Sequence, residues 1–173
     1  MIKNTETLSL IADSLDRRPA RSLPVLDELF RRLPACTDPA LASETEDRIW
    51  ELWMHHPNRE AREILDLATR DIAARRYDIA ETRLARLVRH RPDFAEAWHK
   101  RATLYYLVAR DEECVGDIRR TLQLEPRHFG AILHFAELLL ADGLHDEARL
   151  AFFRALCLNP HLARARDALR ALG

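Results

Sequence analysis

The chain has 173 residues and a formal net charge of −1, with 27 basic and 28 acidic side chains. That balance argues against a global attraction to nucleic acid or to an anionic membrane surface. The three cysteines are far apart in the sequence and the chain has only four glycines, so we expect no disulfide framework, no zinc site and no phosphate-binding loop.

The first segment, residues 1–22, carries acidic side chains where a signal peptide needs an unbroken apolar stretch. We therefore expect a cytoplasmic protein. The alternative is a periplasmic protein whose true N-terminus carries a signal peptide. Leu8, Ile11 and Leu15 would share one face of a short helix, so the segment is expected to be either loosely helical or disordered.

Residues 23–60 predict a helical hairpin that resembles a repeat unit. A short helix is expected over 25–33, and a longer one follows the break at Pro34–Pro39. Trp50 and Trp53 supply part of the apolar face of the longer helix. Because both cannot face one narrow seam, one of them is expected to be partly exposed as a candidate dimerisation edge.

The next three segments repeat with a period of 34 residues. Pro92, Pro126 and Pro160 mark the period, and the surrounding sequences recur in phase as VRHRPDFAEAW, LQLEPRHFGAI and LCLNPHLARAR. Such a period predicts two antiparallel helices that bury their apolar faces only against neighbouring units. Gly143 falls at the turn inside the last hairpin, where a left-handed residue is favoured. We predict repeats at 61–94, 95–128 and 129–162, followed by a capping helix at 163–173.

These residues resemble the tetratricopeptide repeat (TPR) superfamily over 61–172. From about Val25 the chain is similar to small bacterial TPR proteins found chiefly in alphaproteobacteria. The similarity rests on LDELFRRL, ACTDPA, RIWELW, PDFAEAWHKRATLYYL and LEPRHFGA. It implies an all-α solenoid of TPR-type helical hairpins wound into a right-handed superhelix. The first helix of each hairpin would line the concave wall.

The resemblance places ligand-binding side chains on that concave wall. TPR domains that clamp chaperone C-termini use Lys and Asn at set positions, and this chain has Leu65, Thr69, His99 and Thr103 among the equivalents, so the clamp is absent. A mixture of apolar, aromatic and polar side chains suits an extended or helical peptide. The predicted groove residues are Arg62, Leu65, Thr69, Glu96, His99, Lys100, Thr103, Tyr106, Leu133, Glu137 and Leu140.

Arg101 departs from the repeat pattern, because neighbouring repeats place Leu67 and Phe135 at the same core-facing position. A buried guanidinium needs a counter-ion. We expect a structural ion pair with Asp117 on the second helix of the same hairpin, with Glu125 as the second choice. The alternative is a pocket for an anionic ligand formed by Arg101, His99, Lys100 and Tyr106.

Seven arginines and three acidic residues lie within 70–91. We expect a solvated helix face with internal ion pairs. An acidic protein partner ranks second, and nucleic acid is unlikely because no base-reading motif is present.

The function predicted from these features is a non-catalytic scaffold that binds a protein or peptide in the concave groove. No catalytic set, metal-ligand spacing or cofactor motif is visible, so we expect neither an enzyme nor a cofactor or metal site, and no membrane partner. The alternative is a self-associating structural protein, a candidate homo-oligomer. Its groove would be filled by its own or a neighbour's N-terminal segment 1–22.

Overall fold

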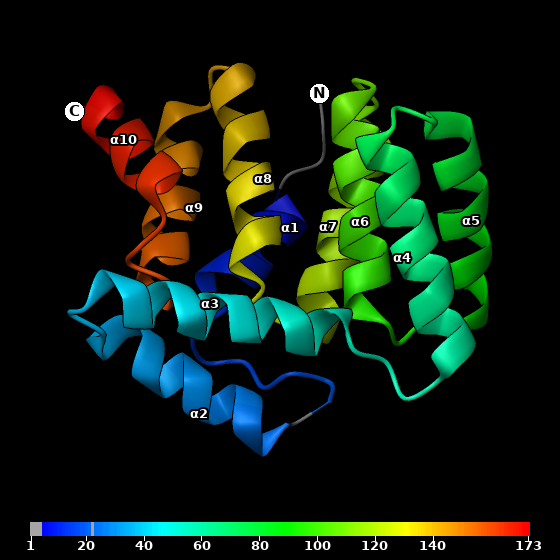
Figure 1. Ribbon diagram of the computed structural model, residues 1–173. Helices are drawn as coiled ribbons and strands as arrows, with labels where there is room; N and C mark the ends of the chain where they lie inside the picture. Colours follow the sequence, from blue (N-terminus) through cyan, green and yellow to red (C-terminus); the bar gives the residue numbers. More distant parts are fainter. Residues whose placement is uncertain (1–4, 22) are drawn as a thin grey trace.

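Helices make up all the regular structure in the described part of the chain, residues 5–21 and 23–173 of a computed structural model. The expected all-α repeat fold is confirmed, and expectations for residues 1–4 and 22 lie outside this part. The elements are α1 Thr5–Ala12, α2 Pro24–Arg32, the 3-10 helix η1 Leu33–Ala35, α3 Pro39–Met54, α4 Arg59–Ala73, α5 Tyr77–His90, α6 Ala95–Leu107, α7 Asp111–Leu124, α8 Phe129–Ala141, α9 His145–Leu158 and α10 Ala163–Leu172 (Figure 1).

Three helical hairpins, α4–α5, α6–α7 and α8–α9, stand side by side. Within each hairpin the two helices pack closely, because small side chains recur where they cross. A larger side chain at these points would push the helices apart. The recurring small residues are all 0 % exposed: Ala68, Ala80, Ala102, Cys114, Ala136 and Ala148. Helix α10 packs on α9 at the end of the row.

Each hairpin turns through a left-handed residue at the same point of the repeat. Arg75, Ala109 and Gly143 have φ angles of 57°, 54° and 74°. Glycine adopts this conformation without a steric penalty, whereas a side chain with a Cβ does not. The first two hairpins therefore keep a local strain that the third avoids.

Replacing Ala109 by glycine should raise the free energy of unfolding by about 1 kcal/mol. Relief of a left-handed alanine is worth roughly 1–2 kcal/mol, and the greater freedom of glycine in the unfolded chain offsets part of it. Urea unfolding followed by circular dichroism measures the change. Ala85→Gly inside α5 is the control and should lower stability. A destabilised Ala109→Gly variant would contradict the strain at this turn.

The α2–α3 hairpin does not stack on α4 as a further repeat would. Helix α3 runs across the ends of the other helices and packs against α2, η1 and α6 (Figure 1). Ile49 and Trp53 of α3 are buried in the core shared with the second and third hairpins. Leu67, for which the repeat phase predicts a core-facing position, is consequently 42 % exposed, because no helix in the described chain covers the outward face of α4.

Helix α1 packs against α7 and α9, the second helices of their hairpins, and lies behind α8 in Figure 1. Ile11 is fully buried there, and the Ala20 amide donates to the Leu124 carbonyl at 2.8 Å. The described part of the N-terminal segment is thus ordered on the convex side of its own chain, not in the concave groove. Among the helices described here, none combines the length and apolarity that crossing a bilayer requires.

Candidate functional site

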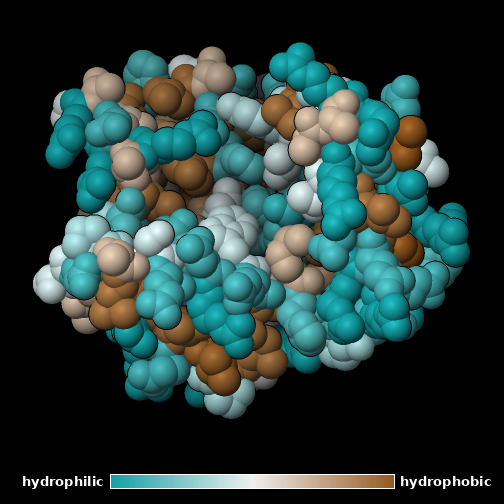
Figure 2. All heavy atoms as spheres, in the orientation of Figure 1, coloured by the Kyte–Doolittle hydropathy of each residue, from teal (hydrophilic) through white to brown (hydrophobic). Residues whose placement is uncertain are grey.

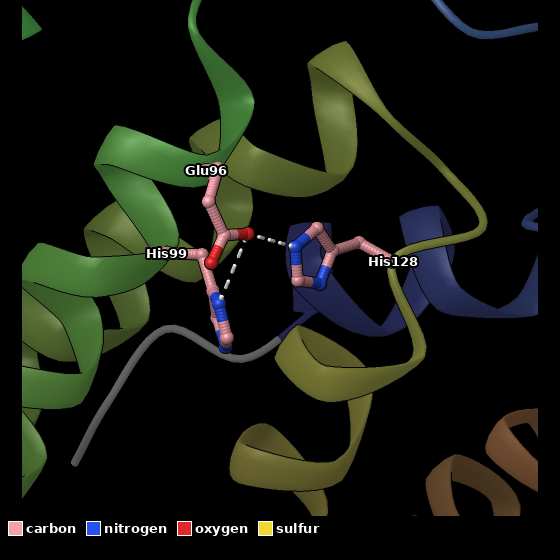
Figure 3. A group of neighbouring side chains, drawn as sticks. All are labelled: Glu96, His99 and His128. Atoms are coloured by element: carbon pink, nitrogen blue, oxygen red, sulfur yellow. Dashed lines mark hydrogen bonds and ion pairs between the residues drawn. The ribbon is translucent and has the colours of Figure 1, made fainter. Parts of the chain in front are cut away.

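The concave side forms a groove between the hairpins, with α3 along its lower edge (Figure 2). The wall of this groove holds a buried carboxylate, Glu96 of α6, surrounded by basic side chains (Figure 3). Its Oε2 lies 2.8 Å from Nε2 of His128 and 3.5 Å from Nδ1 of His99, and its Oε1 lies 3.2 Å from Nζ of Lys100. Burial alone would raise the pKa of Glu96, but His99, His128 and Lys100 hold it well below its usual value. The carboxylate is therefore ionised.

His128 is the N-cap residue of α8. Its Nδ1 accepts a hydrogen bond from the Ala131 amide at 3.1 Å, in the way that a serine or aspartate side chain caps most helices. This bond leaves the ring proton on Nε2, which donates to Glu96. The imidazole therefore joins the start of the third hairpin to the start of the second.

Glu96, His99 and His128 place three potential metal-ligand atoms within 4.8 Å of one another. A His2Glu set is a familiar zinc ligand combination. However, a metal would need the lone pair of His128 Nε2, and that nitrogen is protonated while Nδ1 caps α8. Two ligands would remain, fewer than a zinc site uses. We therefore interpret this group as a hydrogen-bonded pair, Glu96 and His128, with an adjoining imidazole.

Four rings lie nearly parallel along the concave wall, and we call them the ring stack. Tyr106 stacks on His134 with centroids 5.5 Å apart and planes at 7°. His134 stacks on His99 at 5.2 Å and 25°, and His99 on Trp50 at 5.9 Å and 28°. Helices α6, α8 and α3 each contribute to the stack. It runs from the open end of the groove to the helix that closes its lower edge.

Several buried polar atoms in and beside the ring stack have no hydrogen-bond partner in the described chain. They include Nε2 of His99 and Nδ1 of His134, whereas Nδ1 of His99 lies 3.5 Å from Oε2 of Glu96 and the Glu137 carboxylate interacts with Tyr106 and Arg164. Burial lowers the pKa of His99 to about 3 and that of His134 to about 4, so both rings are neutral near neutral pH. Unsatisfied buried groups are rare in proteins and call for an explanation such as an absent binding partner.

Close approach of α3 to α8 depends on Gly130. A Cβ at this position would lie 2.6 Å from Cη2 of Trp50 and 3.4 Å from Cε1 of His99. The missing side chain lets Trp50 reach the ring stack. Trp50 is half-buried and Trp53 is 7 % exposed, and both contact Phe129 at centroid distances of 5.4 and 5.0 Å, so the two tryptophans share one cluster.

Gly130→Ala should lower the free energy of unfolding by about 1–3 kcal/mol, the usual range for overpacking. Gly116→Ala in α7 is the matched control, because an added Cβ there meets nothing within 4 Å. It should instead raise stability by roughly 0.5–1 kcal/mol. Chemical unfolding gives both values, and tryptophan fluorescence reports the movement of Trp50. Equal effects of the two substitutions would contradict the close approach at Gly130.

The predicted groove residues do not all reach the groove surface. For Leu65 the structure differs from the prediction: the side chain is 0 % exposed in the core beneath α4, because α5 and α6 pack beside that helix. Glu96, His99 and Leu133 are also buried, and the Thr69 and Thr103 hydroxyls donate to carbonyls of their own helices. The side chains that are partly open are Arg62, Thr69, Lys100, Thr103, Tyr106, Glu137 and Leu140.

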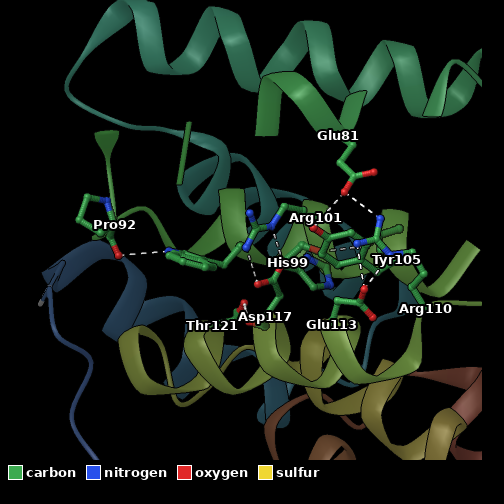
Figure 4. A network of polar contacts seen from close by, with 11 residues as sticks. Glu81, Pro92, His99, Arg101, Tyr105, Arg110, Glu113, Asp117 and Thr121 are labelled. Carbon is green, nitrogen blue, oxygen red and sulfur yellow. Dashed lines mark hydrogen bonds and ion pairs between the residues drawn. The ribbon is translucent and has the colours of Figure 1, made fainter. Parts of the chain in front are cut away.

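Arg101 forms a bidentate pair with Asp117, at 2.6 Å from Nε to Oδ2 and 2.8 Å from Nη2 to Oδ1 (Figure 4). The guanidinium also lies over the Trp98 ring, 5.1 Å from its centroid. Asp117 raises the pKa of Arg101, while burial raises the pKa of Asp117 against the effect of the guanidinium. The contact stays within the second hairpin. Because Lys100 pairs with Glu96, the expected alternative of a shared anion pocket has no free cation from these two residues.

The arginine block is organised by a single acid, Asp71 of α4. This carboxylate accepts from Arg76 at 2.7 Å and from Arg83 at 2.8 Å, and these bonds tie α5 to α4. Hydrogen bonding to Arg76 is the largest of the effects that lower the pKa of Asp71. Two of the seven arginines are therefore structural.

Sequence reasoning missed the Glu96–His128 pair. The two residues are 32 positions apart and belong to different repeats. One signal was present: Phe94 and Leu162 occupy the same phase of the repeat as His128. A histidine at an otherwise apolar turn position indicates a polar contact that the neighbouring repeats lack.

No protein-family model matches the chain. The chain is similar to a TPR repeat-containing protein of Rhizobium etli, with 30% identity over 160 residues that cover 91% of this chain and 78% of the relative. This similarity agrees with the period of 34 residues and with the row of helical hairpins. The chain belongs to the tetratricopeptide repeat family.

Proposed function

We propose that this protein is a non-catalytic scaffold that holds a segment of a partner protein on its concave face. Membership of the TPR family and the helical repeat fold support a role in protein interaction in general. The observation that carries the choice of face is the open hollow between α3 and α4, which is lined by Trp50 and adjoins the ring stack.

The concave side also has room for a segment. An open hollow of about 750 Å³ lies between α3 and α4, and Trp50 lines it. Trp50 stacks on His99 on its other side, so the hollow and the ring stack adjoin. Half-buried Tyr106 lies at the far end of the stack. A partner segment that crosses the groove would contact all three features.

Site-specific photo-cross-linking in the native host tests this proposal. A photoreactive phenylalanine analogue replaces Tyr106 on the concave face or Phe153 on α9, where the side chain is 55 % exposed. We expect a cross-linked partner from position 106 and none from position 153. Cross-links that form only from position 153 would place the interaction on the convex side and contradict the proposal.

Self-association is a second candidate, favoured by the uncovered face of the first hairpin. Leu67 and half-buried Ile64 occupy the repeat positions at which Phe135 and Ile132 are fully buried in the third hairpin. A second copy could cover these side chains. Light scattering across a concentration series tests this candidate. Loss of an oligomer in Leu67→Glu would support it, and a monomer at all concentrations would exclude it.

A further inference from the structure

We infer that the partner segment is basic, with lysine or arginine side chains entering the hollow between α3 and α4. The inference rests on the proposed function and specifies the chemistry of the partner. Four carboxylates and two guanidinium groups line the hollow: Asp47, Glu51, Glu63, Asp66, Arg59 and Arg62. The local charge is therefore negative.

The two arginines of the hollow are already engaged. Arg59 donates to Glu63 at 2.7 Å, and Arg62 donates to the His56 carbonyl and to the Pro57 carbonyl. Asp47 and Asp66 form no ion pair with any residue of 5–21 or 23–173. The hollow thus has, among the described residues, two carboxylates without an ion pair, Asp47 and Asp66, against one guanidinium, Arg62, that hydrogen-bonds only to carbonyls. Charge complementarity favours a basic segment over an acidic one.

Trp50 and Met54 give the hollow an apolar wall. A lysine or arginine stem packs well on such a surface, and its charged head is attracted to the face of an indole ring. The chain already uses this contact: Nζ of Lys100 lies 5.8 Å from the centroid of the Trp50 ring. An incoming basic side chain would make the same kind of contact from the side of the hollow.

The charged groups beyond Trp50 are paired within the described chain and do not oppose a basic segment. His99 is 4 % exposed and lies against Trp50, and its Nδ1 lies 3.5 Å from Oε2 of Glu96. The Glu137 carboxylate interacts with Tyr106 and Arg164, and Nδ1 of His134 has no hydrogen-bond partner among the described residues. The cations nearby, Lys100 and Arg164, each pair with a carboxylate, at 3.2 Å from Glu96 and 2.6 Å from Glu137. Lys100 and Arg164 therefore present no unpaired charge to a basic segment.

A selection from a random peptide library tests the inference without knowledge of the natural partner. The full chain is the target, and Tyr106→Ala serves as a counter-target to find binders that depend on the concave face. Matched peptides of equal length carrying Lys, Gln or Glu at the same positions are then compared by fluorescence polarisation. We expect selected sequences rich in Lys and Arg, and binding that weakens as salt screens the charges.

Two acidic variants locate the basic side chains. Asp47→Asn with Asp66→Asn should weaken binding of the Lys peptide by about fivefold or more, as expected when exposed charge pairs are lost. Glu112→Gln on α7 is the matched control, because Glu112 is exposed and has no ion pair with the described residues. Its affinity for the peptide should match that of the unmodified chain.

The outcomes separate the inference from the proposed function. Concave-face binders that are neutral or acidic would overturn the inference and leave the scaffold intact. Failure to find any binder that depends on Tyr106 would overturn both. Concentration-dependent association of the chain with itself, abolished by Arg86→Glu with Arg89→Glu, would show that the basic segment is α5 of a second copy, which also overturns a foreign partner.

Discussion

Asp117→Leu should destabilise the protein by about 3–5 kcal/mol, the effect expected when one partner of a buried ion pair is removed. The Arg101 and Asp117 side chains are only 16% and 7% exposed, so the guanidinium would stay buried without a counter-ion. The double variant Arg101→Leu with Asp117→Leu should regain most of the loss, because two apolar side chains pack together and leave no buried charge. Urea unfolding of the two single variants and the double variant gives the coupling energy.

The ion pair predicts strong non-additivity in this double-mutant cycle. We expect the sum of the two single effects to exceed the effect of the double variant by about 3 kcal/mol or more. Removal of the exposed pair Arg119–Glu6 is the control and should change stability by less than about 1 kcal/mol. If the effects of Arg101→Leu and Asp117→Leu simply add, the pair does not fix the hairpin.

The second large effect that we expect is on pH dependence. The free energy of unfolding should fall steeply as the pH drops below about 6.5. His99 and His134 have pKa values of about 3 and about 4 in the folded protein, well below the ordinary value of 6.5, because burial disfavours their charged forms. Between the folded and the ordinary pKa of each histidine, the unfolded chain binds more protons than the folded protein. Each histidine therefore removes up to about 1.4 kcal/mol of stability per pH unit as the pH falls. Glu96, whose folded pKa is lowered, adds a further loss only below about pH 4.5.

Urea unfolding over the range from about pH 7 to about pH 4 measures this dependence. His99→Gln and His134→Gln should each flatten it, since the titrating group is gone. His145→Gln at an exposed site is the control and should keep the dependence of the unmodified protein. A stability that does not change over this range would show that the two imidazoles are not held neutral by burial.

The repeats could be predicted from the sequence because their signals are local and periodic. The small residues at helix crossings and the turn glycine act within one hairpin, and each of the three prolines lies in the short connection between a hairpin and the next helix. The Arg101–Asp117 contact also lies within one hairpin, so the choice of partner followed from the repeat phase. In each of these instances the interacting residues share one short stretch of chain.

The arrangement of α3 could not be predicted in the same way. Its position depends on Trp50 meeting Gly130 and on Trp53 stacking on His128 at 4.1 Å, contacts that join residues from separate units. Because α3 crosses the groove instead of stacking on α4, Leu67 is left exposed. The same crossing buries His99 beneath Trp50. Sequence phasing indicates which helix face a residue shares, but not which distant element covers that face.

Hydrogen exchange with and without a library-selected peptide tests the central claim, that the concave face holds the partner segment, most directly. The account predicts slower amide exchange in α3, α4 and α6, next to the hollow and the ring stack, and unchanged exchange in α5 and α9. Slower exchange confined to α5, α7 and α9 would place the partner on the convex side. That result would contradict the account.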